Sequence, residues 1–417
     1  MYNLQYAQQL DAKDPLNKFR AKFHIPTDGE GNDLIYLCGN SLGLQPKKVA
    51  QYLQEELEDW QKLGVEGHTQ ARRPWLSYHE QFTNSVARIV GAKPQEVVVM
   101  NGLTVNLHLL MLSFYKPTKT RYKIIIESAA FPSDKYAVAS QLRFHGYSVE
   151  DGLIELEAKQ GEEYMSTENI LATIEKYKDE AALLLLGGVN YYTGEVIDMP
   201  KICQFAQNLG IVVGYDLAHA VGNIPLHLHD WGVDFAAWCH YKYLNAGPGA
   251  TAGAFVHTKH LLNSNIQRLE GWWGHDKATR FKMPDTYKAI PTAEAWQMSN
   301  APVFSMAPLL ASLEIFDQVS ISDLRMKSIA LTSFLCDLLQ LQLKDKVRII
   351  TPNNIEQRGC QLSLSIGEKG KEVFNALTLN GVIADWREPS VIRIAPVPLY
   401  NTFQDVYQFV QRLAALL

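Results

Sequence analysis

The chain contains 417 residues, of which 47% are hydrophobic and 20% are charged. This length is enough for two or three packed domains, and this balance is typical of a globular enzyme. The net charge of −5 gives no basic surface, so nucleic acid is not expected as a partner.

Nothing in the sequence predicts a membrane segment, a leader or a metal site. No apolar stretch approaches the roughly 18–20 residues of a membrane span, and the N-terminus lacks the basic and apolar regions of a signal peptide. The five cysteines are scattered without a C-x-x-C pair, and the twelve histidines show no tight metal spacing. We therefore expect a cytoplasmic protein with reduced thiols, no membrane partner and no bound metal.

The first 45 residues are expected to form an N-terminal helix and arm that pack with a small domain. A short strand around Tyr36 leads into a glycine-rich turn at 39–45. Pro46 then begins a helix over 47–63, with apolar residues at Val49, Leu53 and Leu57 at helical spacing.

Apolar runs and helical patterns alternate in the next part of the chain. The expected strands cover 97–100, 122–126, 183–186, 211–213 and 235–238, and the expected helices cover 104–114, 133–144 and 199–209. Near-continuous apolar strands separated by helices predict a mixed, mainly parallel sheet that is covered on both faces. We assign residues 46–300 to this large α/β domain.

The pattern changes near Asn300-Ala301-Pro302. A helix over 306–318 and further helices near 320–341 are expected there, followed by strands at 347–350, 361–366 and 391–394. Residues 301–417 therefore read as a smaller C-terminal α+β domain.

One acid and one lysine follow two of the expected buried strands. Asp216 lies just past the run 211–213, and Lys242 lies just past the run 235–238. Pyridoxal phosphate needs such a pair, because the lysine amine forms a Schiff base with its aldehyde while the acid keeps the pyridine nitrogen protonated. Taken alone, the two residues are equally compatible with a buried ion pair.

Neighbouring residues favour the cofactor over the ion pair. The segment Asn101–Thr104 would open a helix whose N-terminus binds the phosphate. Phe131 would stack on the pyridine ring, and His219 would reach its phenolic oxygen. Tyr241 would offer its hydroxyl to the phosphate. Singly, these residues also fit a helix N-cap, a core phenylalanine and a structural histidine, but together they fall at the carboxyl ends of strands, where open α/β sheets bind ligands.

Several blocks of the sequence resemble the kynureninase family. They are Leu-Thr-Val-Asn-Leu-His-Leu-Leu at 103–110, Phe-Pro-Ser-Asp at 131–134, Asp-Leu-Ala-His-Ala-Val-Gly-Asn at 216–223, Tyr-Lys-Tyr-Leu-Asn-Ala-Gly at 241–247 and Arg-Ile-Ala-Pro-Val-Pro-Leu-Tyr-Asn at 393–401. The resemblance implies a fold-type-I pyridoxal-phosphate enzyme, similar to class V aminotransferases, that is a homodimer with shared active sites. It also implies hydrolysis of L-kynurenine to anthranilate and L-alanine, and of 3-hydroxy-L-kynurenine to 3-hydroxyanthranilate and L-alanine, in tryptophan catabolism or NAD biosynthesis.

The resemblance assigns catalytic and cofactor-binding roles to residues of this chain. Lys242 would hold the cofactor and move the α-proton, Asp216 would pair with the ring nitrogen, and Tyr241 would join a proton relay. Further cofactor contacts would be Leu103, Thr104, Phe131, Pro132, Ser133, Asp134, Gly187, His219, Trp272 and Asn300. Trp272 and Asn300 would reach the cofactor of the other subunit. Many relatives carry serine where Gly187 stands, so no side-chain contact is implied there.

The resemblance also implies how the substrate binds. Arg393 would grip the α-carboxylate with its bidentate fork, and its place in an apolar strand argues against a surface ion pair. The aryl end would meet a flat pocket that includes His68, Asn40, Ser41, Trp272, Ser299 and Asn300. His68 is expected in a glycine-punctuated loop at 64–68. Together with Ser299 and Asn300 it resembles the pattern associated with preference for the 3-hydroxylated substrate.

Two other classes of function are compatible with parts of the sequence. A cysteine desulfurase, which is another class V enzyme, needs a reactive cysteine on a mobile loop, whereas Cys360 borders an expected strand and Cys336 lies on an expected apolar helix face. A simple aminotransferase belongs to the same alternative. A non-catalytic binding protein of the same fold would be marked by loss of Lys242 or Arg393, and both residues are present.

Overall fold

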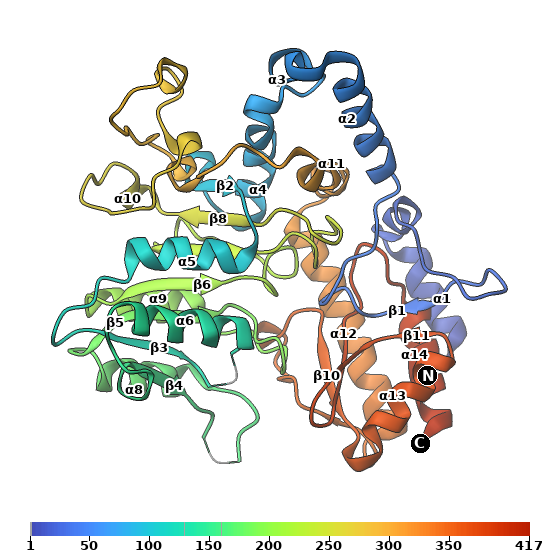
Figure 1. Ribbon diagram of the computed structural model, residues 1–417. Coiled ribbons are helices and arrows are strands. Elements are labelled where there is room, and N and C mark those ends of the chain that lie inside the picture. Colours follow the sequence, from blue (N-terminus) through green and yellow to red (C-terminus); the bar gives the residue numbers. More distant parts are fainter. Residues whose placement is uncertain (1, 129, 160) are drawn as a thin grey trace.

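The computed structural model describes residues 2–128, 130–159 and 161–417 (Figure 1). A larger unit is built around a seven-stranded sheet, and a smaller unit is built around a four-stranded sheet. Both chain termini lie on the smaller unit in Figure 1. Among the described residues, no helix is long and apolar enough to cross a membrane.

The large sheet has the strand order β2-β8-β7-β6-β5-β3-β4. Strand β8 runs antiparallel to both of its neighbours, whereas the pairs formed by β3 to β7 are parallel. The strands are β2 (Val97–Val99), β3 (Lys123–Glu127), β4 (Leu153–Leu156), β5 (Ala181–Gly187), β6 (Val212–Asp216), β7 (Phe235–Trp238) and β8 (Gly253–Val256). This is the mixed, mainly parallel sheet that the sequence predicts.

Both faces of the large sheet are buried, because alternate residues of each strand enter different cores. Leu184 and Leu186 of β5 point into one core, while Leu183 and Leu185 point into the other. Helices α5 (Leu103–Phe114) and α6 (Pro132–Phe144) cover the second face. The first face is covered by α4 (Thr83–Val90), α8 (Thr167–Lys176), α9 (Met199–Asn208) and α11 (Val303–Phe316). Since apolar residues therefore meet no water on either face, the strands read as continuous apolar runs.

The small unit has an antiparallel sheet with the order β12-β13-β10-β9. Its strands are β9 (Arg348–Ile349), β10 (Leu362–Ser365), β12 (Asp385–Arg387) and β13 (Val391–Ile394), and its helices are α12 (Ile321–Leu343), α13 (Gly370–Leu379) and α14 (Phe403–Leu416). The N-terminal arm joins this unit, because α1 (Leu4–Lys13) packs on α14 and β1 (Ile35–Tyr36) pairs with β11 (Val382–Ile383).

The remaining helices are α2 (Val49–Leu63), α3 (Gly67–Gln70), α7 (Val149–Gly152) and α10 (Thr258–Leu261). The expected loop at 64–68 is wrong: a 3₁₀ turn over Gly64–Glu66 leads directly into α3, which carries His68. The buried residues of α11 belong to the core of the large unit, and those in the second half of α12 belong to the core of the small unit. We therefore propose that the boundary between the units falls within α12, C-terminal to the expected position near 301.

Candidate active site

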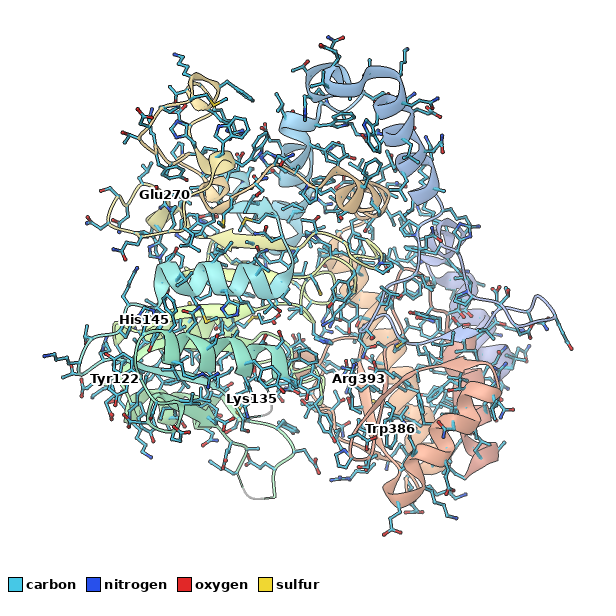
Figure 2. All side chains as sticks on the ribbon, in the orientation of Figure 1. Tyr122, Lys135, His145, Glu270, Trp386 and Arg393 are labelled. Carbon is cyan, nitrogen blue, oxygen red and sulfur yellow. The ribbon has the colours of Figure 1, made fainter. Side chains whose placement is uncertain are left out.

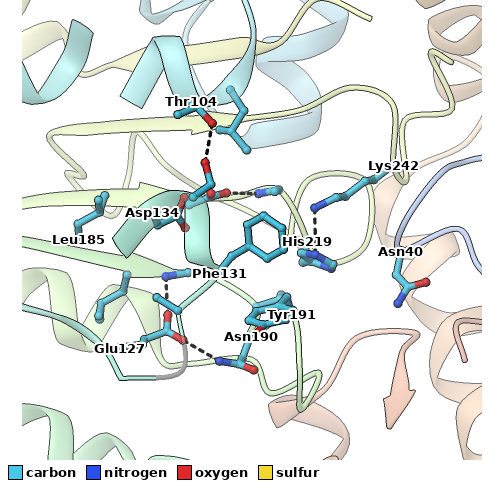
Figure 3. A pocket seen from close by; sticks show the side chains of 18 of the residues that line it. Asn40, Thr104, Glu127, Phe131, Asp134, Leu185, Asn190, Tyr191, His219 and Lys242 are labelled. Carbon is cyan, nitrogen blue, oxygen red and sulfur yellow. Dashed lines mark hydrogen bonds between the residues drawn. The ribbon is translucent and has the colours of Figure 1, made fainter. Parts of the chain in front are cut away.

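Lys242 lies in a cavity of about 420 Å³ between the two units (Figure 3). Asp216 ends β6, and Lys242 follows the neighbouring parallel strand β7, so the sheet brings both to its carboxyl edge. The cavity is lined from the large unit, the arm and the small unit, and we call it the lysine cavity. Its lining residues include Asn40, Ser41, Leu103, Thr104, Phe131, Ser133, Asp134, Gly187, Asp216, His219, Tyr241, Lys242 and Arg393. Most of the predicted site residues therefore meet in one place.

His219 is the direct partner of Lys242, with 3.0 Å between Nε2 and Nζ. Burial lowers the pKa of His219 well below its usual range, and the nearby Lys242 and Arg393 charges lower it further. The ring is therefore neutral, so Nε2 accepts a hydrogen bond from the Lys242 amine while Nδ1 carries the ring hydrogen. Nδ1 is buried and has no partner among the described residues. A polar ligand in the cavity is the natural partner for this atom.

Three buried carboxyl groups line the lysine cavity. Burial raises the pKa of Asp216, whereas the Lys242 charge and a 2.7 Å hydrogen bond from the Ala218 N–H oppose the rise. Burial and the Asp216 charge hold the pKa of Asp134 well above its usual range. Asp134 is thus the neutral acid of the pair and Asp216 the carboxylate.

Glu127 is the third of these acids, and the sequence reading missed it. It ends β3, and its carboxylate accepts hydrogen bonds from the Gly187 N–H at 2.5 Å and from the Asn190 amide at 2.8 Å. The signal was present, since Glu127 follows an apolar strand just as Asp216 does. Gly187 also lies close to Glu127, since a Cβ at Gly187 would lie 3.0 Å from Glu127 Oε1.

An anion site lies at the N-terminus of α5. Gly102 is the N-cap residue, and Leu103 and Thr104 form the first turn, whose backbone N–H groups have no partner within the helix. The Thr104 hydroxyl lies 2.8 Å from the Ser133 hydroxyl, which comes from the first turn of α6 beside Pro132. Two hydroxyls and a helix N-terminus that face one cavity suit a phosphate group.

Two aromatic rings meet at the wall of the lysine cavity. Phe131 precedes α6 and remains 45% exposed, so its side chain does not belong to the core. Its ring meets the edge of Tyr191 at 5.2 Å between centroids.

The half-buried Tyr241 lies beside Lys242, and burial raises the pKa of its hydroxyl, which is therefore protonated at neutral pH.

Arg393 reaches the cavity from β13 of the small unit, where Figure 2 shows it facing the large unit. It is 1% exposed, which excludes the surface ion pair. Its Nη1 donates to the Tyr191 carbonyl at 2.7 Å, and its Nη2 lies 2.8 Å from a carboxylate oxygen of Asp385. Asn40 from the arm is fully buried at the same wall, and its Oδ1 has no partner among the described residues.

Pro132 does not line the lysine cavity, although its neighbours Phe131 and Ser133 do, and four other predicted site residues lie away from the cavity of their own chain. His68 and Asn300 line a separate apolar pocket of about 160 Å³, which also contains Trp60, Trp75 and Phe304 and which we call the His68 pocket. The exposed Ser299 neighbours Asn300. Trp272 is 47% exposed in a 3₁₀ turn and donates its indole hydrogen to the Arg280 carbonyl.

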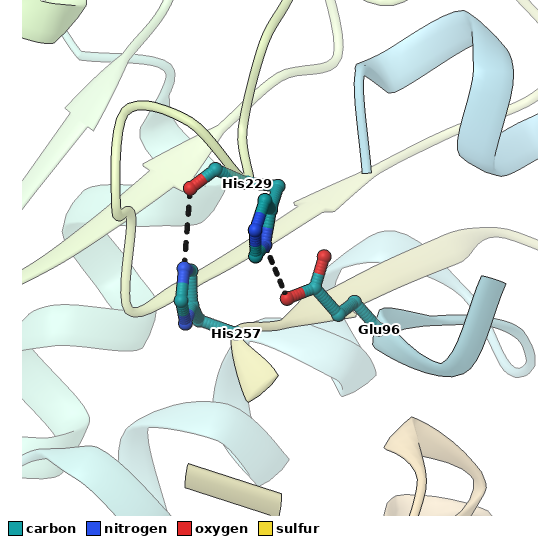
Figure 4. Close-up of side chains that lie close together, drawn as sticks. All are labelled: Glu96, His229 and His257. Atoms are coloured by element: carbon teal, nitrogen blue, oxygen red, sulfur yellow. Dashed lines mark hydrogen bonds and ion pairs between the residues drawn. The ribbon is translucent and has the colours of Figure 1, made fainter. Parts of the chain in front are cut away.

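Two acid–histidine clusters of the described chain bring metal-ligating atoms together, but their own hydrogen bonds occupy most of these atoms. In Figure 4, Glu96 accepts from the His229 ring at 2.8 Å, and the His257 ring donates to the His229 carbonyl at 3.1 Å. The other His257 ring nitrogen accepts from the Lys259 N–H. The second cluster, around Glu294, is bridged by Lys277. The hydrogen bonds and ion pairs of each cluster therefore link segments within the large unit.

The donor set of the lysine cavity fits a flat, anionic aldehyde with a ring nitrogen. The Lys242 amine suits the aldehyde, the α5 N-terminus suits a phosphate, Phe131 offers an aromatic face, and Asp216 suits a protonated ring nitrogen. The unpartnered His219 Nδ1 gives the ligand one more fixed contact. These are the groups of pyridoxal 5'-phosphate, and Arg393 adds a carboxylate-binding group on the opposite wall.

Known proteins resemble this chain in both sequence and fold. A family model described as the kynureninase C-terminal domain matches residues 324–413. A protein named kynureninase from Myxococcus xanthus is 55% identical over 98% of this chain and 96% of its own length. One of the same name from Flavobacterium psychrophilum is 53% identical over 98% and 97%, respectively.

Solved structures share the fold at low sequence identity. A cysteine desulfurase from Thermococcus onnurineus superposes with a TM-score of 0.76 at 17% identity, over 96% of this chain and 97% of that one. A C-DES variant with glycine covalently linked to its PLP cofactor gives 0.79 at 14% identity, over 95% and 98%. These likenesses establish the fold class alone.

Proposed function

The chain belongs to the kynureninase family, and from this membership we propose that it hydrolyses L-kynurenine to anthranilate and L-alanine with pyridoxal 5'-phosphate as cofactor. One observation carries the proposal beyond family membership. The group of Lys242, His219 and Asp216 lines the same cavity as Arg393, so an amine-binding end and a carboxylate-binding end share one cavity. An α-amino acid presents these two groups on one carbon.

When bound, pyridoxal phosphate supplies an aldehyde for amines and a ring that withdraws electrons from the substrate's α-carbon. Lys242 holds the cofactor and moves the proton at that carbon. Asp216 keeps a proton on the ring nitrogen, and the neutral Asp134 keeps the charge on Asp216 by donating to it. Thr104, Ser133 and the first turn of α5 hold the phosphate, while Leu103 and Phe131 border the ring.

Cleavage between the β- and γ-carbons requires water to add to the carbonyl beside the aryl ring, which calls for a proton donor near that oxygen. Tyr241 is our candidate, because its hydroxyl stays protonated and lies on the cavity next to Lys242. The small unit and the arm shield this step from bulk water, since Arg393, Asn40 and Ser41 close the cavity on the side away from the sheet.

We further propose a homodimer in which each lysine cavity is completed by the partner. His68, Ser299, Asn300 and Trp272 lie outside their own chain's lysine cavity. Exposed aromatic residues line the pocket of His68 and Asn300, since Trp60 is 58% exposed and Phe304 43% exposed, and such a patch is typical of a protein interface. The partner's His68 pocket would receive the aryl end of the substrate, where an imidazole and an amide can bind the hydroxyl of 3-hydroxykynurenine. We therefore include that compound as a second substrate.

We assign both reactions to the cytoplasm, in tryptophan catabolism or NAD synthesis.

The alternative activities have weaker support. A cysteine desulfurase needs a reactive thiolate, whereas burial raises the pKa of Cys360 and Cys38 to about 12 and also raises the pKa of Cys336. Thiols of this kind are poor nucleophiles at neutral pH. A non-catalytic binding protein would have no need for Lys242 and Arg393 to face one cavity.

The proposal is tested with purified protein that has been loaded with pyridoxal phosphate. We expect release of L-alanine from L-kynurenine, together with visible absorbance from the bound cofactor. Replacing Lys242 with alanine should lower the rate by at least ~1000-fold and remove the absorbance of the lysine-bound cofactor, because no other amine occupies that position. Lys346→Ala, at an exposed lysine of the small unit, serves as the control. Wild-type protein that binds the cofactor but releases no alanine would refute the assignment.

A further inference from the structure

Arg393 does not stand alone in the small unit, because Asp385 and Arg387 share its face of the sheet. Strands β12 and β13 pair so that Asp385 lies directly opposite Arg393. Arg387 lies two residues after Asp385, so it projects from the same face of the strand. Both arginines line the lysine cavity.

Both guanidinium groups form ion pairs with the Asp385 carboxylate. Asp385 Oδ2 lies 2.8 Å from Arg393 Nη2 and accepts from Arg387 Nη2 at 3.0 Å. Oδ1 accepts from Arg393 Nε at 3.2 Å and lies 2.8 Å from Arg387 Nε. The Asp385 side chain is 10% exposed and that of Arg393 is 1% exposed, whereas that of Arg387 remains 34% exposed. Asp385 therefore fixes the positions of two cations, of which Arg387 is the more open to the cavity.

The charge balance of this group limits what Arg393 can do. Asp385 neutralises Arg393, so these two residues together offer no net charge to an incoming anion. A substrate carboxylate would add a second negative group beside Asp385 in a largely buried place, which is unfavourable without another cation. Arg387 supplies that cation, and the group of three then carries one positive charge to match one carboxylate.

The hydrogen-bond inventory agrees with this role. Arg393 Nη1 already donates to the Tyr191 carbonyl, which leaves few of its hydrogens for a ligand. Among the described residues, Arg387 makes hydrogen bonds and ion pairs only with Asp385, through Nε and Nη2, so its Nη1 is available.

We propose that Arg387 is a second substrate-binding arginine, which contacts the α-carboxylate together with Arg393 and determines the preference for amino acids over amines. This inference rests on the proposed function only for the identity of the substrate, since the contact itself applies to any α-amino acid in the cavity. Asp385 is the residue that positions both arginines.

The test uses the cofactor-loaded enzyme and two probes that differ only in the carboxylate, L-alanine and ethylamine. Binding is followed by the change in the cofactor's visible absorption. Arg387→Gln should weaken L-alanine binding by roughly 10- to 100-fold, because it removes a charged hydrogen-bonding partner. Ethylamine binding should change by less than ~3-fold, since it makes no use of the arginine. With L-kynurenine, KM should rise by a similar roughly 10- to 100-fold while kcat changes by less than ~3-fold.

Two further variants separate charge from folding. Arg387→Lys keeps the charge and should recover at least ~5-fold of the lost L-alanine affinity, even though lysine lacks the fork. Arg348→Gln, at an exposed arginine on the opposite edge strand of the same sheet, should bind both probes like the wild type. Equal weakening of both probes by Arg387→Gln, or unchanged L-alanine binding, would overturn the inference. Neither probe needs turnover, so these results stand apart from a wild-type enzyme that fails to cleave kynurenine.

Discussion

Asp134 and Asp216 are two buried carboxyl groups in one cavity, and their surroundings give them different charges. Asp216 has the Lys242 cation and a backbone N–H as partners, whereas Asp134 faces the negative charge of Asp216. Burial penalises ionisation of both groups, so the one with the poorer partners keeps its proton. The chemistry at the ring nitrogen therefore depends on Asp216, while Asp134 acts as a neutral hydrogen-bond donor.

This difference predicts unequal effects of two matched substitutions. Asp216→Asn removes the charge that holds the ring proton, and kcat/KM should fall by ~100-fold or more. Asp134→Asn replaces a neutral acid with a neutral amide of the same shape that can still donate, so the loss should stay below ~10-fold. Steady-state kinetics on cofactor-loaded variants measure both effects, and circular dichroism verifies their folding. Losses of equal size would contradict the assignment of charges.

Glu195 should make stability depend on pH. Burial raises its pKa to about 8 in the folded chain, from 4.5 when the group is free in solution. The unfolded chain therefore releases this proton first, and the contribution of Glu195 to the free energy of unfolding falls as the pH rises from about 4.5 to about 8. Glu195→Gln removes this loss and should stabilise the protein by about 1–4 kcal/mol at pH 8.5 but by little at pH 4.5.

Urea denaturation of the wild type and Glu195→Gln at these two pH values checks the prediction. Glu368→Gln, at an exposed carboxyl group of the small unit, is the matched control and should show no such difference. A stabilisation by Glu195→Gln that is as large at low pH as at high pH would point to packing rather than ionisation.

The strands with continuous apolar runs were predictable from the sequence, as were β1, β9, β10 and β13, whereas β4, β8, β11 and β12 were not predicted. The five runs that include 183–186 and 235–238 all form strands of the large sheet. Of these unpredicted strands, β8 and β12 read Gly-Ala-Phe-Val and Asp-Trp-Arg, and neither carries a run of three or more large apolar residues. Each of them depends on neighbours that are distant in sequence or that need a particular hairpin register, which local propensity does not encode.

The same limit explains which site residues could be foreseen. Asp216 and Lys242 follow apolar strands, so their positions at a sheet edge could be derived from the sequence. The role of Arg387 depends on its contact with Asp385, which the register of β12 and β13 places opposite Arg393. No local sequence pattern predicts that register. His68 was expected in a loop, because the glycines before it are typical of a loop. In the structure Gly67 instead allows close packing, since a Cβ there would collide with the Trp75 ring.

The glycine-rich turn of the arm supports the loop that carries Lys242. The Gly43 N–H donates to the Tyr241 carbonyl at 2.8 Å, and a Cβ at Gly43 would collide with the Lys242 carbonyl and with Asn245. Gly43→Ala should therefore displace Lys242 and lower kcat/KM by ~10-fold or more, because small shifts of a catalytic group are costly.

Gly29→Ala is the control for this substitution. Gly29 lies in the same arm, and a Cβ there would meet nothing within 4 Å. Kinetics and urea denaturation of both variants separate the two effects. A Gly43→Ala enzyme with the rate of the wild type would show that the turn does not position Lys242.

At the scale of the whole molecule, the residues proposed for one active site are divided between two places on the chain. If a partner's His68 pocket and Trp272 complete each lysine cavity, two inactive variants should restore each other. Lys242→Ala inactivates the lysine cavity of its own chain. The double variant Trp272→Ala/Asn300→Ala removes the residues that this chain would provide to its partner's cavity. A mixed dimer then contains one fully native site, so random mixing should recover about a quarter of the wild-type sites.

The measurement is alanine release after the two variants are unfolded, mixed and refolded, with each variant refolded alone as the control. Size-exclusion chromatography verifies that dimers have formed. Activity that stays at the level of the separate variants would exclude shared sites.

The N-terminal arm packs against α14, so the arm can dock only after α14 has been synthesised. Helix α1 packs on α14, and the Asn401 amide donates to the Tyr36 carbonyl at 2.9 Å. A ribosome makes α14 long after the arm, so the arm that bears Asn40, Ser41 and Gly43 has no docking partner until α14 has been synthesised. The large sheet can form earlier, since its last strand ends at Val256. A nascent chain thus presents an open, unfinished cavity, and the finished site for the cofactor exists only after α14 has left the ribosome.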